Sequence, residues 1–375
     1  MSLEPLALKN LPRRDFIKQV GYAAAGTAVL SQLVPALADG APPTVVLALV
    51  GGAHIHTPSY MQILKNRPDV KIKCVWDHDT ARAGKWGATL GCPVADDPKV
   101  IWSDTEIKGV VICSETDRHK DLVQAAAAAG KNMFVEKPLG FTSEDSKAMA
   151  AAIDKAKVIF TTGYFMRTDP ILLFLKEQVA KGSFGKISRV RASNCHAGSL
   201  GHWFDTDYRW MADPKIAGVG AFGDLGTHVL DILMWIFGDV NSITAEIKVV
   251  AGNYGDCDES GEALMSFKSG IIGTLAAGWV DLANPVTFLI SGTEGFAYVD
   301  QGRLFFASKN VPGADGREPW TDLPPRVPLP MEQFVDAIGG KTGMPLVTPQ
   351  EAAARVSVME AAYKGSHAHA WVSPA

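Results

Sequence analysis

One stretch decides the fold that we expect: Asn132-Met133-Phe134-Val135-Glu136-Lys137-Pro138-Leu139-Gly140. Its apolar start, 133–135, is typical of a strand that is covered on both faces. Pro138 ends this strand and favours an extended or turn conformation for Lys137. Glu136 and Lys137 then lie at the carboxyl end of the strand, the edge where open α/β sheets bind ligands. A chemical role for Lys137 therefore competes with the plainer interpretation of a surface loop lysine.

The residues around this stretch alternate between strand and helix patterns. Predicted strands cover 44–50, 70–76, 109–113 and 158–161, and predicted helices cover 81–90, 120–129 and 143–156. A further helical pattern follows the glycine turn and includes Met61 and Leu64. Alternation of this kind predicts an α/β fold with a doubly wound parallel sheet.

A glycine turn follows the first predicted strand. Backbone N–H groups at such a strand–turn–helix junction can hold a pyrophosphate. We therefore expect the cofactor-binding residues of this turn to be Gly51, Gly52, Ala53, His54 and Ile55. The full G-x-G-x-x-G pattern is absent, because Ala53 and His56 replace its second and third glycines. His56 can instead face the cofactor or the substrate.

Asp77 ends the second predicted strand, roughly 20 residues after the glycine turn. An acid in this place suits the ribose hydroxyls of a dinucleotide. No arginine follows it directly, so the pattern favours NAD over NADP. The alternative is a plain turn residue.

The first 38 residues have the features of an export signal. Arg13-Arg14-Asp15-Phe16-Ile17-Lys18 is a twin-arginine pattern, an apolar run covers 20–33, and Ala36-Leu37-Ala38 is typical of a cleavage site. We expect a mature chain that starts near Asp39 and an exported, periplasmic protein. The alternative is an uncleaved amphipathic or membrane helix.

Composition excludes several classes of protein. The 375 residues carry a net charge of −4, which argues against a nucleic-acid partner, and no apolar run suits a confident membrane span. The five cysteines lack metal-binding spacing, and their odd number leaves at least one without a partner in the chain. Cys195 and Cys257 are a possible pair, which an oxidising compartment would allow.

The second half predicts a different domain. After a helix over 171–180, strands are expected at 185–195, 245–250, 262–267, 271–279, 285–290 and 296–299, with a proline-rich loop over 310–330 and helices at 331–338 and 349–363. Such a series predicts a large, mostly antiparallel sheet with one open face. That face makes a homo-oligomer, a dimer or a tetramer, the expected assembly.

A second polar motif lies at Asp224, His228 and Asp231. On one helix these three side chains share a face, and a carboxylate four residues from a histidine can orient its ring and raise its pKa. The competing interpretation makes Asp224 a helix cap and His228 a packed core residue.

Taken together, these motifs resemble the Gfo/Idh/MocA family of sugar and cyclitol oxidoreductases. The resemblance rests on Val135-Glu136-Lys137-Pro138-Leu139, on 110–119, on Gly163 to Pro170 and on the Asp224/His228 spacing, and it extends over the whole mature chain. After the predicted signal peptide over 1–38, it implies a Rossmann domain that binds NAD(P) over 39–162 and a C-terminal α+β substrate and oligomerisation domain over 163–375.

The resemblance also implies roles for single residues. Lys137, Asp224 and His228 would be catalytic, with His228 the general base, Asp224 a substrate or relay partner, and Lys137 the holder of the substrate hydroxyl. The cofactor site would further include Ser114, Thr116, His119, Glu136 and Lys137. The substrate site would include Tyr164, Arg167, His202, Trp203, Arg209 and Trp210 beside the catalytic three. We expect no metal, because no carboxylate or cysteine spacing accompanies His54, His56 and His119.

Export constrains the reaction, because free nicotinamide cofactor is a cytoplasmic resource. We therefore expect a tightly bound cofactor that is recycled internally during oxidation of a secondary hydroxyl of a sugar, glycoside or cyclitol. An NAD-dependent glycosidase, which oxidises, eliminates, adds water and re-reduces, is the alternative, and a non-catalytic sugar-binding protein is a second.

Overall fold

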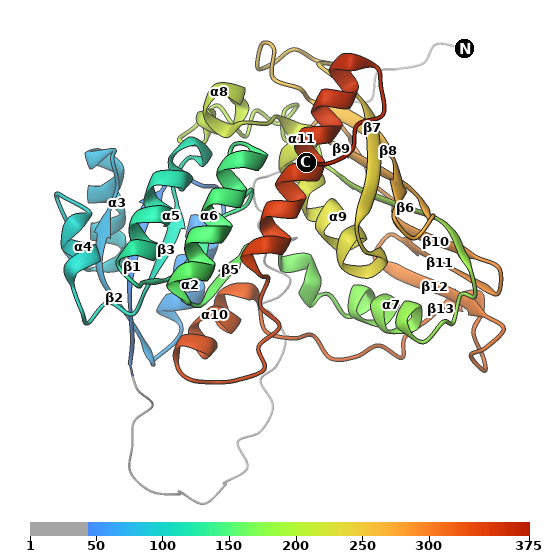
Figure 1. Ribbon diagram of the computed structural model, residues 1–375, viewed down its shortest axis with the longest axis horizontal. Helices are drawn as coiled ribbons and strands as arrows, with labels where there is room; N and C mark the ends of the chain where they lie inside the picture. Colours follow the sequence, from blue (N-terminus) through green and yellow to red (C-terminus); the bar gives the residue numbers. More distant parts are fainter. Residues whose placement is uncertain (1–43) are drawn as a thin grey trace, which may run out of the picture. The chain divides into compact units, whose positions relative to one another are not determined.

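The computed structural model describes residues 44–375, so the predicted signal peptide lies outside the described residues. A five-stranded parallel sheet in the order β2-β1-β3-β4-β5 forms the first half (Figure 1). Its strands are β1 (Val45–Gly52), β2 (Val70–Trp76), β3 (Gly109–Cys113), β4 (Asn132–Val135) and β5 (Phe160–Thr162). The predicted strand before Glu136 is therefore confirmed, and so is the doubly wound parallel architecture.

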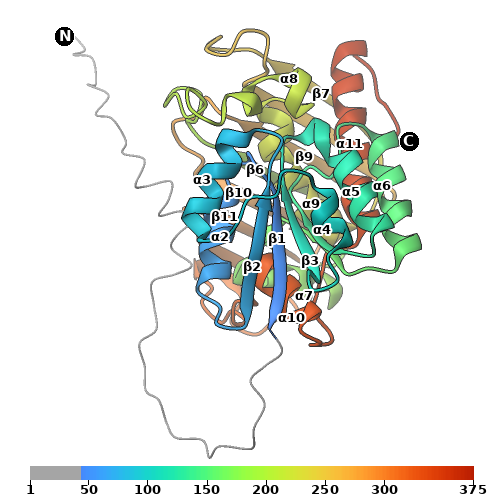
Figure 2. The same cartoon turned by 90° about the vertical axis from the view of Figure 1, so that its left-hand side faces the viewer.

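Helices cover both faces of this sheet (Figure 2). They are α2 (Thr57–Lys65), α3 (Thr80–Leu90), α4 (Lys99–Ser103), α5 (His119–Ala128) and α6 (Ser143–Ala156), with a short 3-10 turn η1 (Thr116–Arg118) before α5. Asp79 and Thr142 accept backbone N–H groups of the first turns of α3 and α6, as expected of N-caps. Such caps fix where each helix begins after its strand.

The second half contains an eight-stranded sheet in the order β13-β12-β11-β10-β6-β9-β8-β7. Its strands are β6 (Ile187–Cys195), β7 (Val240–Lys248), β8 (Ser260–Phe267), β9 (Ile272–Gly278), β10 (Val286–Gly292), β11 (Gly295–Asp300), β12 (Arg303–Ser308) and β13 (Asp315–Pro319). Only the β6–β9 pair among these is parallel, which confirms a mostly antiparallel sheet. The prediction of an uninterrupted loop over 310–330 is wrong, because β13 pairs with β12 there.

One face of this sheet carries the long helix α9 (Ala221–Phe237), whose side chains are nearly all buried. The remaining helical elements of the second half are η2 (Phe165–Thr168), α7 (Pro170–Ala180), η3 (Arg209–Ala212) and α8 (Pro214–Ala217). Within the described residues, the segment Pro214–Phe237 has the length and apolarity of a membrane span, but 78% of its apolar window is buried inside the protein. Burial of this extent is typical of a core helix.

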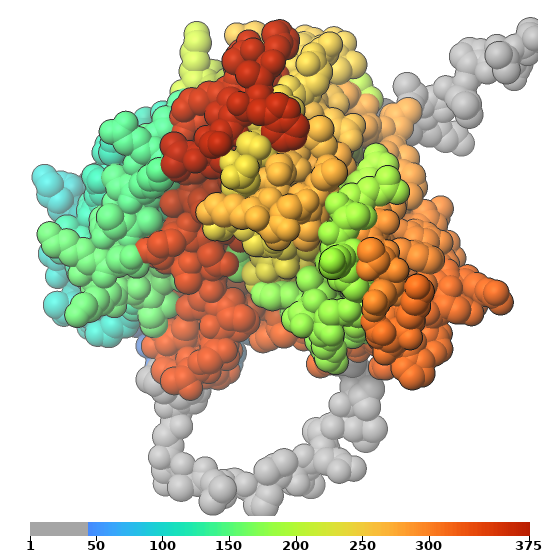
Figure 3. Space-filling view, turned by 45° about the vertical axis from the view of Figure 1, so that its right-hand side comes forward, coloured from blue at the N-terminus to red at the C-terminus, as the bar shows by residue number. Residues whose placement is uncertain are grey.

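The last two helices, α10 (Pro330–Ile338) and α11 (Pro349–Ala368), return to the first sheet. Met331 and Phe334 of α10 join the core on the α2 face, whereas Ala352 and Val356 of α11 join the core on the α5 and α6 face. Further along α11, Met359 belongs to the core of the second half. Figure 3 shows this C-terminal segment, in red, between the green first half and the yellow strands of the second.

Candidate active site

The site is centred on an ion pair between the two halves of the chain. Lys137 follows β4, and its Nζ lies 2.5 Å from Oδ1 of Asp224 in the first turn of α9. The Lys137 side chain is 2% exposed. The sequence predicted both residues separately, and the structure places them in contact. The Lys137–Pro138 peptide bond is cis.

Asp224 is held by a second donor as well. The indole Nε1 of Trp279, at the end of β9, lies 3.3 Å from Oδ2 of Asp224. Burial opposes ionisation of Asp224, but the ammonium of Lys137 overcomes this and holds the pKa of the carboxyl well below its usual range. Asp224 is therefore ionised at neutral pH. Trp279 was missed from the sequence as a site residue, since its strand pattern identified it only as an apolar strand end.

His228 lies one turn further along α9, and it is buried. Its ring centroid is 5.0 Å from that of Phe165 and 6.2 Å from that of His56. Burial first, and then the nearby charge of Lys137, lowers the pKa of His228 well below its usual value. The prediction that Asp224 would orient this ring is wrong, because the Asp224 carboxylate binds Lys137 and Trp279 instead. The charge of Asp224 does raise the pKa of His228, as predicted, but burial, Lys137 and His56 together outweigh it. A neutral imidazole can still accept a proton.

The start of α9 is fixed from a distant loop. Asp258 accepts the backbone N–H groups of Gly220 and Phe222 at 3.0 and 2.8 Å, and its carboxylate also accepts the hydroxyl of Tyr363 from α11. These bonds satisfy N–H groups that a helix leaves open at its N-terminus. Asp224 is therefore presented to Lys137 by a helix end that is held in place.

The glycine turn lies at the carboxyl end of β1, as predicted. Gly51 has a φ of 75°, and a Cβ built there would lie 2.6 Å from the Cβ of Ser114. Only glycine allows both this backbone conformation and this approach of β1 to the end of β3. Next in the turn, His54 donates its N–H to the carbonyl of Cys113.

Asp77 is buried at the end of β2 and accepts four hydrogen bonds. Oδ2 binds Gly52 N and Nε of Arg82, while Oδ1 binds Asp79 N and Nη2 of Arg82. The carboxylate thus joins the glycine turn to α3, where ribose hydroxyls of a dinucleotide would be bound. Arg82, five residues downstream, was not recognised from the sequence as its partner. A glycine turn, a carboxylate and the start of α2 together fit a dinucleotide.

The loop after β3 contacts the loop that carries Lys137. The side chain of His119 lies within 3.2 Å of the carbonyls of Pro138 and Leu139 and within 3.3 Å of that of Ser114. Ser114 and Thr116 are buried beside it. These residues connect the loop after β3 to the loop that carries Lys137, so they position the cofactor side of the site.

Glu136 is fully buried next to Lys137. Its Oε1 accepts the hydroxyl of Tyr60 at 2.5 Å and lies 2.7 Å from Nδ1 of His56, while Oε2 accepts the N–H of Lys137. Burial opposes ionisation, but the hydrogen-bonded contact with His56 and the ammonium of Lys137 lower the pKa of Glu136 well below its usual value. Burial itself lowers the pKa of His54 to about 3.

Two residues expected in the substrate site are engaged inside the protein. Tyr164 is buried and its hydroxyl lies 2.9 Å from Oγ1 of Thr227. Arg167 binds both carboxylate oxygens of Asp231 and also Glu351. Asp231 lies on the same helix as Asp224, as expected, and it binds this buried arginine and Arg355. Arg167 and Asp231 therefore connect η2, α9 and α11.

The other expected substrate residues lie on the loop after β6. Trp210 reaches the catalytic region, since its Nε1 donates to Ala53 O and its ring centroid is 5.9 Å from that of His54. His202 is exposed and pairs with Asp205, and the ring of Trp203 lies against His196. The structure thus brings Trp210 to the glycine turn and leaves His202 at the surface.

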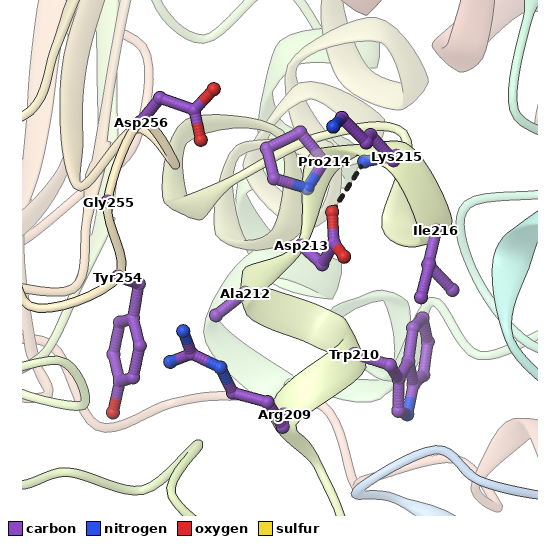
Figure 4. Close-up of a pocket in the computed structure, with 10 residues that line it drawn as sticks. All are labelled: Arg209, Trp210, Ala212, Asp213, Pro214, Lys215, Ile216, Tyr254, Gly255 and Asp256. Carbon is purple, nitrogen blue, oxygen red and sulfur yellow. Dashed lines mark hydrogen bonds between the residues drawn. The ribbon is translucent and has the colours of Figure 1, made fainter.

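A cavity of about 460 Å³ opens beside this loop (Figure 4). The guanidinium of Arg209 lies 4.7 Å from the ring centre of Tyr254, and the two side chains face the cavity together. Asp213 accepts the backbone N–H of Lys215 nearby. Residues of α8 and of the loop around Asp256 complete the lining of the cavity. Aromatic and charged groups together suit a polyhydroxylated ligand.

All five cysteines lie in the described part of the chain, and all are free thiols. The possible Cys195–Cys257 bridge is therefore absent. Burial raises the pKa of Cys195 and of Cys257, each to about 12, so neither is an activated thiolate.

Comparison with known proteins identifies the family. Residues 45–164 match the model described as "Oxidoreductase family, NAD-binding Rossmann fold", and residues 172–298 match the "GFO/IDH/MocA C-terminal domain". The chain belongs to the Gfo/Idh/MocA oxidoreductase family. Its first domain is thus an NAD-binding Rossmann domain, as the glycine turn and Asp77 indicated.

Relatives within the Gfo/Idh/MocA family include two dehydrogenases. Myo-inositol 2-dehydrogenase of Thermotoga maritima is 32% identical over 240 residues, which are 61% of this chain and 67% of that protein. Levoglucosan dehydrogenase of Pseudarthrobacter phenanthrenivorans is 29% identical over 241 residues, which are 56% of this chain and 61% of that protein. The alignments thus span about two thirds of these relatives.

Solved Gfo/Idh/MocA structures show the same fold. Levoglucosan dehydrogenase in complex with NADH and levoglucosan has a TM-score of 0.71 and 21% identity, over 88% of this chain and 99% of that one. Aldose-aldose oxidoreductase from Caulobacter crescentus has a TM-score of 0.74 and 18% identity, over 88% of this chain and 99% of that one.

Proposed function

We propose that this protein is an NAD-dependent oxidoreductase that oxidises a secondary hydroxyl of a sugar, glycoside or cyclitol. The observation that carries the proposal is the ion pair between the buried Lys137 and the partly buried Asp224 at the carboxyl end of the dinucleotide-binding sheet, with the neutral ring of His228 one helical turn away. A cation, a carboxylate and a proton acceptor are the groups that oxidation of an alcohol requires.

The chain's own residues divide this work. Lys137 donates a hydrogen bond to the substrate hydroxyl and stabilises the alkoxide as it forms. His228 accepts the hydroxyl proton, which its lowered pKa permits at neutral pH. Asp224 holds the ammonium of Lys137 in place and is itself held by Trp279. NAD, when bound by the glycine turn and Asp77, supplies the acceptor for the hydride.

The substrate class is supported by relatives and by the loop after β6. Two relatives are named for levoglucosan and myo-inositol, both of which are polyhydroxylated rings. In this chain Trp210 extends from the glycine turn towards the cavity lined by Arg209 and Tyr254. The cavity shares Trp210 with the surroundings of the glycine turn and offers polar and aromatic groups to such a ring, while Lys137 and His228 lie outside its lining.

We further propose that the protein is exported and keeps its cofactor. The twin-arginine pattern supports export of a folded protein, and a periplasmic enzyme cannot draw on the cytoplasmic pool of NAD. The cofactor would then be re-oxidised on the protein by a second carbonyl compound. Fractionation of cells that express the full chain into periplasm, cytoplasm and membranes tests the location. The control is the double variant Arg13→Lys, Arg14→Lys.

Purified protein tests the reaction. We expect absorbance of reduced nicotinamide to rise when a sugar or cyclitol is added, and to fall when a carbonyl acceptor follows. Release of an aryl group from a glycoside without net redox change would favour the glycosidase instead. Sugar binding with no redox change and no hydrolysis would contradict any catalytic function.

A further inference from the structure

Three side chains from two separate loops converge beside Lys137. His54 and His56 come from the turn after β1, and Glu136 comes from the end of β4. Each of the three offers one ligand atom, and these atoms lie within 4.8 Å of one another. Nδ1 of His56 is 2.7 Å, and Nδ1 of His54 is 3.6 Å, from the same oxygen of Glu136. His54 and Glu136 are buried, and His56 is 16% exposed.

We propose that His54, His56 and Glu136 form a binding site for a divalent metal ion, and that Zn²⁺ is the ion whose chemistry fits it best. Two imidazoles and one carboxylate form a ligand set that zinc uses in catalytic sites, where the fourth position stays open. The sequence concealed this set, because its carboxylate lies 80 residues after His56 and is separated from it by β3 in the sheet.

The distances suit this ion. Zinc bonds of about 2.0–2.2 Å place two tetrahedral ligand atoms roughly 3.3 Å apart. The separations of 2.7 and 3.6 Å from Glu136 lie on either side of that value, so small side-chain rotations would form the site. The ring centroids of His54 and His56 are 4.6 Å apart, close to the roughly 5 Å expected for two imidazoles on one ion.

The hydrogen bonds of these side chains show which atoms would be the metal ligands. Nδ1 of His54 accepts the backbone N–H of His56 at 3.2 Å, so this nitrogen is unprotonated, and an ion that binds there would replace this hydrogen bond. Tyr60 donates to Glu136 and thereby fixes its orientation, as groups behind metal ligands commonly do. Nδ1 of His56 and Oε1 of Glu136 share a proton in their hydrogen bond, and an ion bound between these two atoms would replace that proton.

A third imidazole, that of His228, lies near this cluster. The buried Nδ1 of His228 lacks a hydrogen-bond partner among residues 44–375. Buried polar atoms are rarely left in this state, and an ion or a group not present in the structure is a common reason. Its ring centroid is 6.2 Å from that of His56.

Metal titration of the full chain, purified with its bound cofactor and treated with a chelator, tests the proposal. We expect one equivalent of Zn²⁺ to bind by calorimetry and elemental analysis, and Co²⁺ to give the intense visible absorbance of a four-coordinate site. Failure of the wild-type protein to bind either ion at micromolar concentrations would overturn the proposal, whatever the variants do.

Substitutions then locate the ion. His56→Gln and His54→Gln should each weaken binding at least tenfold, and His367→Gln, on the exposed end of α11, should leave it unchanged. Far-UV circular dichroism identifies any variant that fails to fold. Equal binding by the wild type and both cluster variants would place the ion elsewhere and contradict the site. Because these measurements need no substrate, they stand or fall separately from the dehydrogenase activity.

Discussion

Lys137 is the residue on which the proposed chemistry depends most. Replacing it by alanine removes the donor to the developing alkoxide, so we expect kcat to fall by about 100- to 1,000-fold. The dissociation constant for NAD should change only a few-fold, because the cofactor is held mainly by the glycine turn and Asp77. Stopped-flow turnover and a fluorescence titration with NAD measure the two quantities.

Lys147→Ala is a suitable control for this prediction, since Lys147 is exposed on α6. If Lys137→Ala loses NAD affinity and turnover to the same extent, Lys137 serves cofactor binding and the assignment is wrong.

Replacing Asp77 should lower NAD affinity more than turnover, which is the opposite of the result expected for Lys137→Ala. Its carboxylate is buried at the end of β2, and loss of charged hydrogen bonds to the ribose costs about 1.5–3 kcal/mol, or roughly 10- to 100-fold in NAD affinity. Asp77→Ala should therefore bind NAD weakly while retaining much of its kcat at saturating cofactor. Asp96→Ala, an exposed site on the same domain, serves as the control. Unchanged NAD affinity of Asp77→Ala would exclude the ribose role.

Individual residue types were readable from the sequence, but their partners were not. Lys137 and Asp224 each follow a recognisable local pattern, and the two were expected on opposite sides of one site. The contacts of Asp224 with Trp279 and of Glu136 with His56 and Tyr60 join residues that are far apart in the chain. Such contacts depend on how loops meet in space, which periodicity and spacing do not encode. Arg167 was predicted to bind substrate, but it forms a buried ion pair with Asp231 inside the protein.

Among the elements, the loop around Glu259 shows how the site is supported from outside. The carboxylate of Glu259 accepts the backbone N–H groups of residues 250–252 and the hydroxyl of Ser199. The N–H of Trp279 in turn donates to the carbonyl of Glu259. This buried acid thereby connects the two loops beside Trp279 and hence the partner of Asp224.

The contribution of Glu259 to stability should depend on pH. Burial opposes ionisation, but the bonds from Ser199 and the backbone lower the pKa of Glu259 below its ordinary value of 4.5. Stability from this group is therefore fully present above pH 4.5 and is lost as the pH falls through the folded-state pKa. Glu259→Gln should cost about 1–3 kcal/mol of unfolding free energy at neutral pH and less in acid.

Urea unfolding of both proteins at neutral pH and below pH 4.5 measures this difference. Glu262→Gln is the matched control, because Glu262 is exposed on the neighbouring strand. A difference between wild type and Glu259→Gln that does not change with pH would refute the role of the charge.

Regular elements with clear periodicity were predicted closely, and the exceptions have physical reasons. β1 and β3 are apolar runs followed by turn residues, β2 alternates polar and apolar residues, and α10 carries an apolar face. β13 was missed because its sequence, Asp315-Gly316-Arg317-Glu318-Pro319, is polar and ends in proline. As an edge strand it needs no second partner, so it tolerates residues that a central strand would exclude.

At the scale of the whole molecule, the two sheets should unfold together. α11 contributes Ala352 and Val356 to the core of the first sheet and Met359 to that of the second. The buried cluster of Asp231, Arg167 and Arg355 further joins α9, η2 and α11. Because the two cores share a helix, we expect a single cooperative transition in urea.

Far-UV circular dichroism and tryptophan fluorescence measure this prediction, since the tryptophans are distributed over both halves. Coincident curves would support the shared core, and two separate transitions would contradict it. Asp231→Ala should lower the free energy of unfolding by about 3–5 kcal/mol, because two buried arginines lose the carboxylate that both bind and keep the partly exposed Glu351 beside them.

The position of α11 also determines when the protein can finish folding during its synthesis. The first sheet is translated early, yet part of the surface that covers it is made only at residues 349–368. Ala126, Met149 and their neighbours therefore remain partly uncovered on the ribosome until the last helix has left the exit tunnel. We expect the nascent chain to expose apolar surface throughout that interval, and such surface is what chaperones bind.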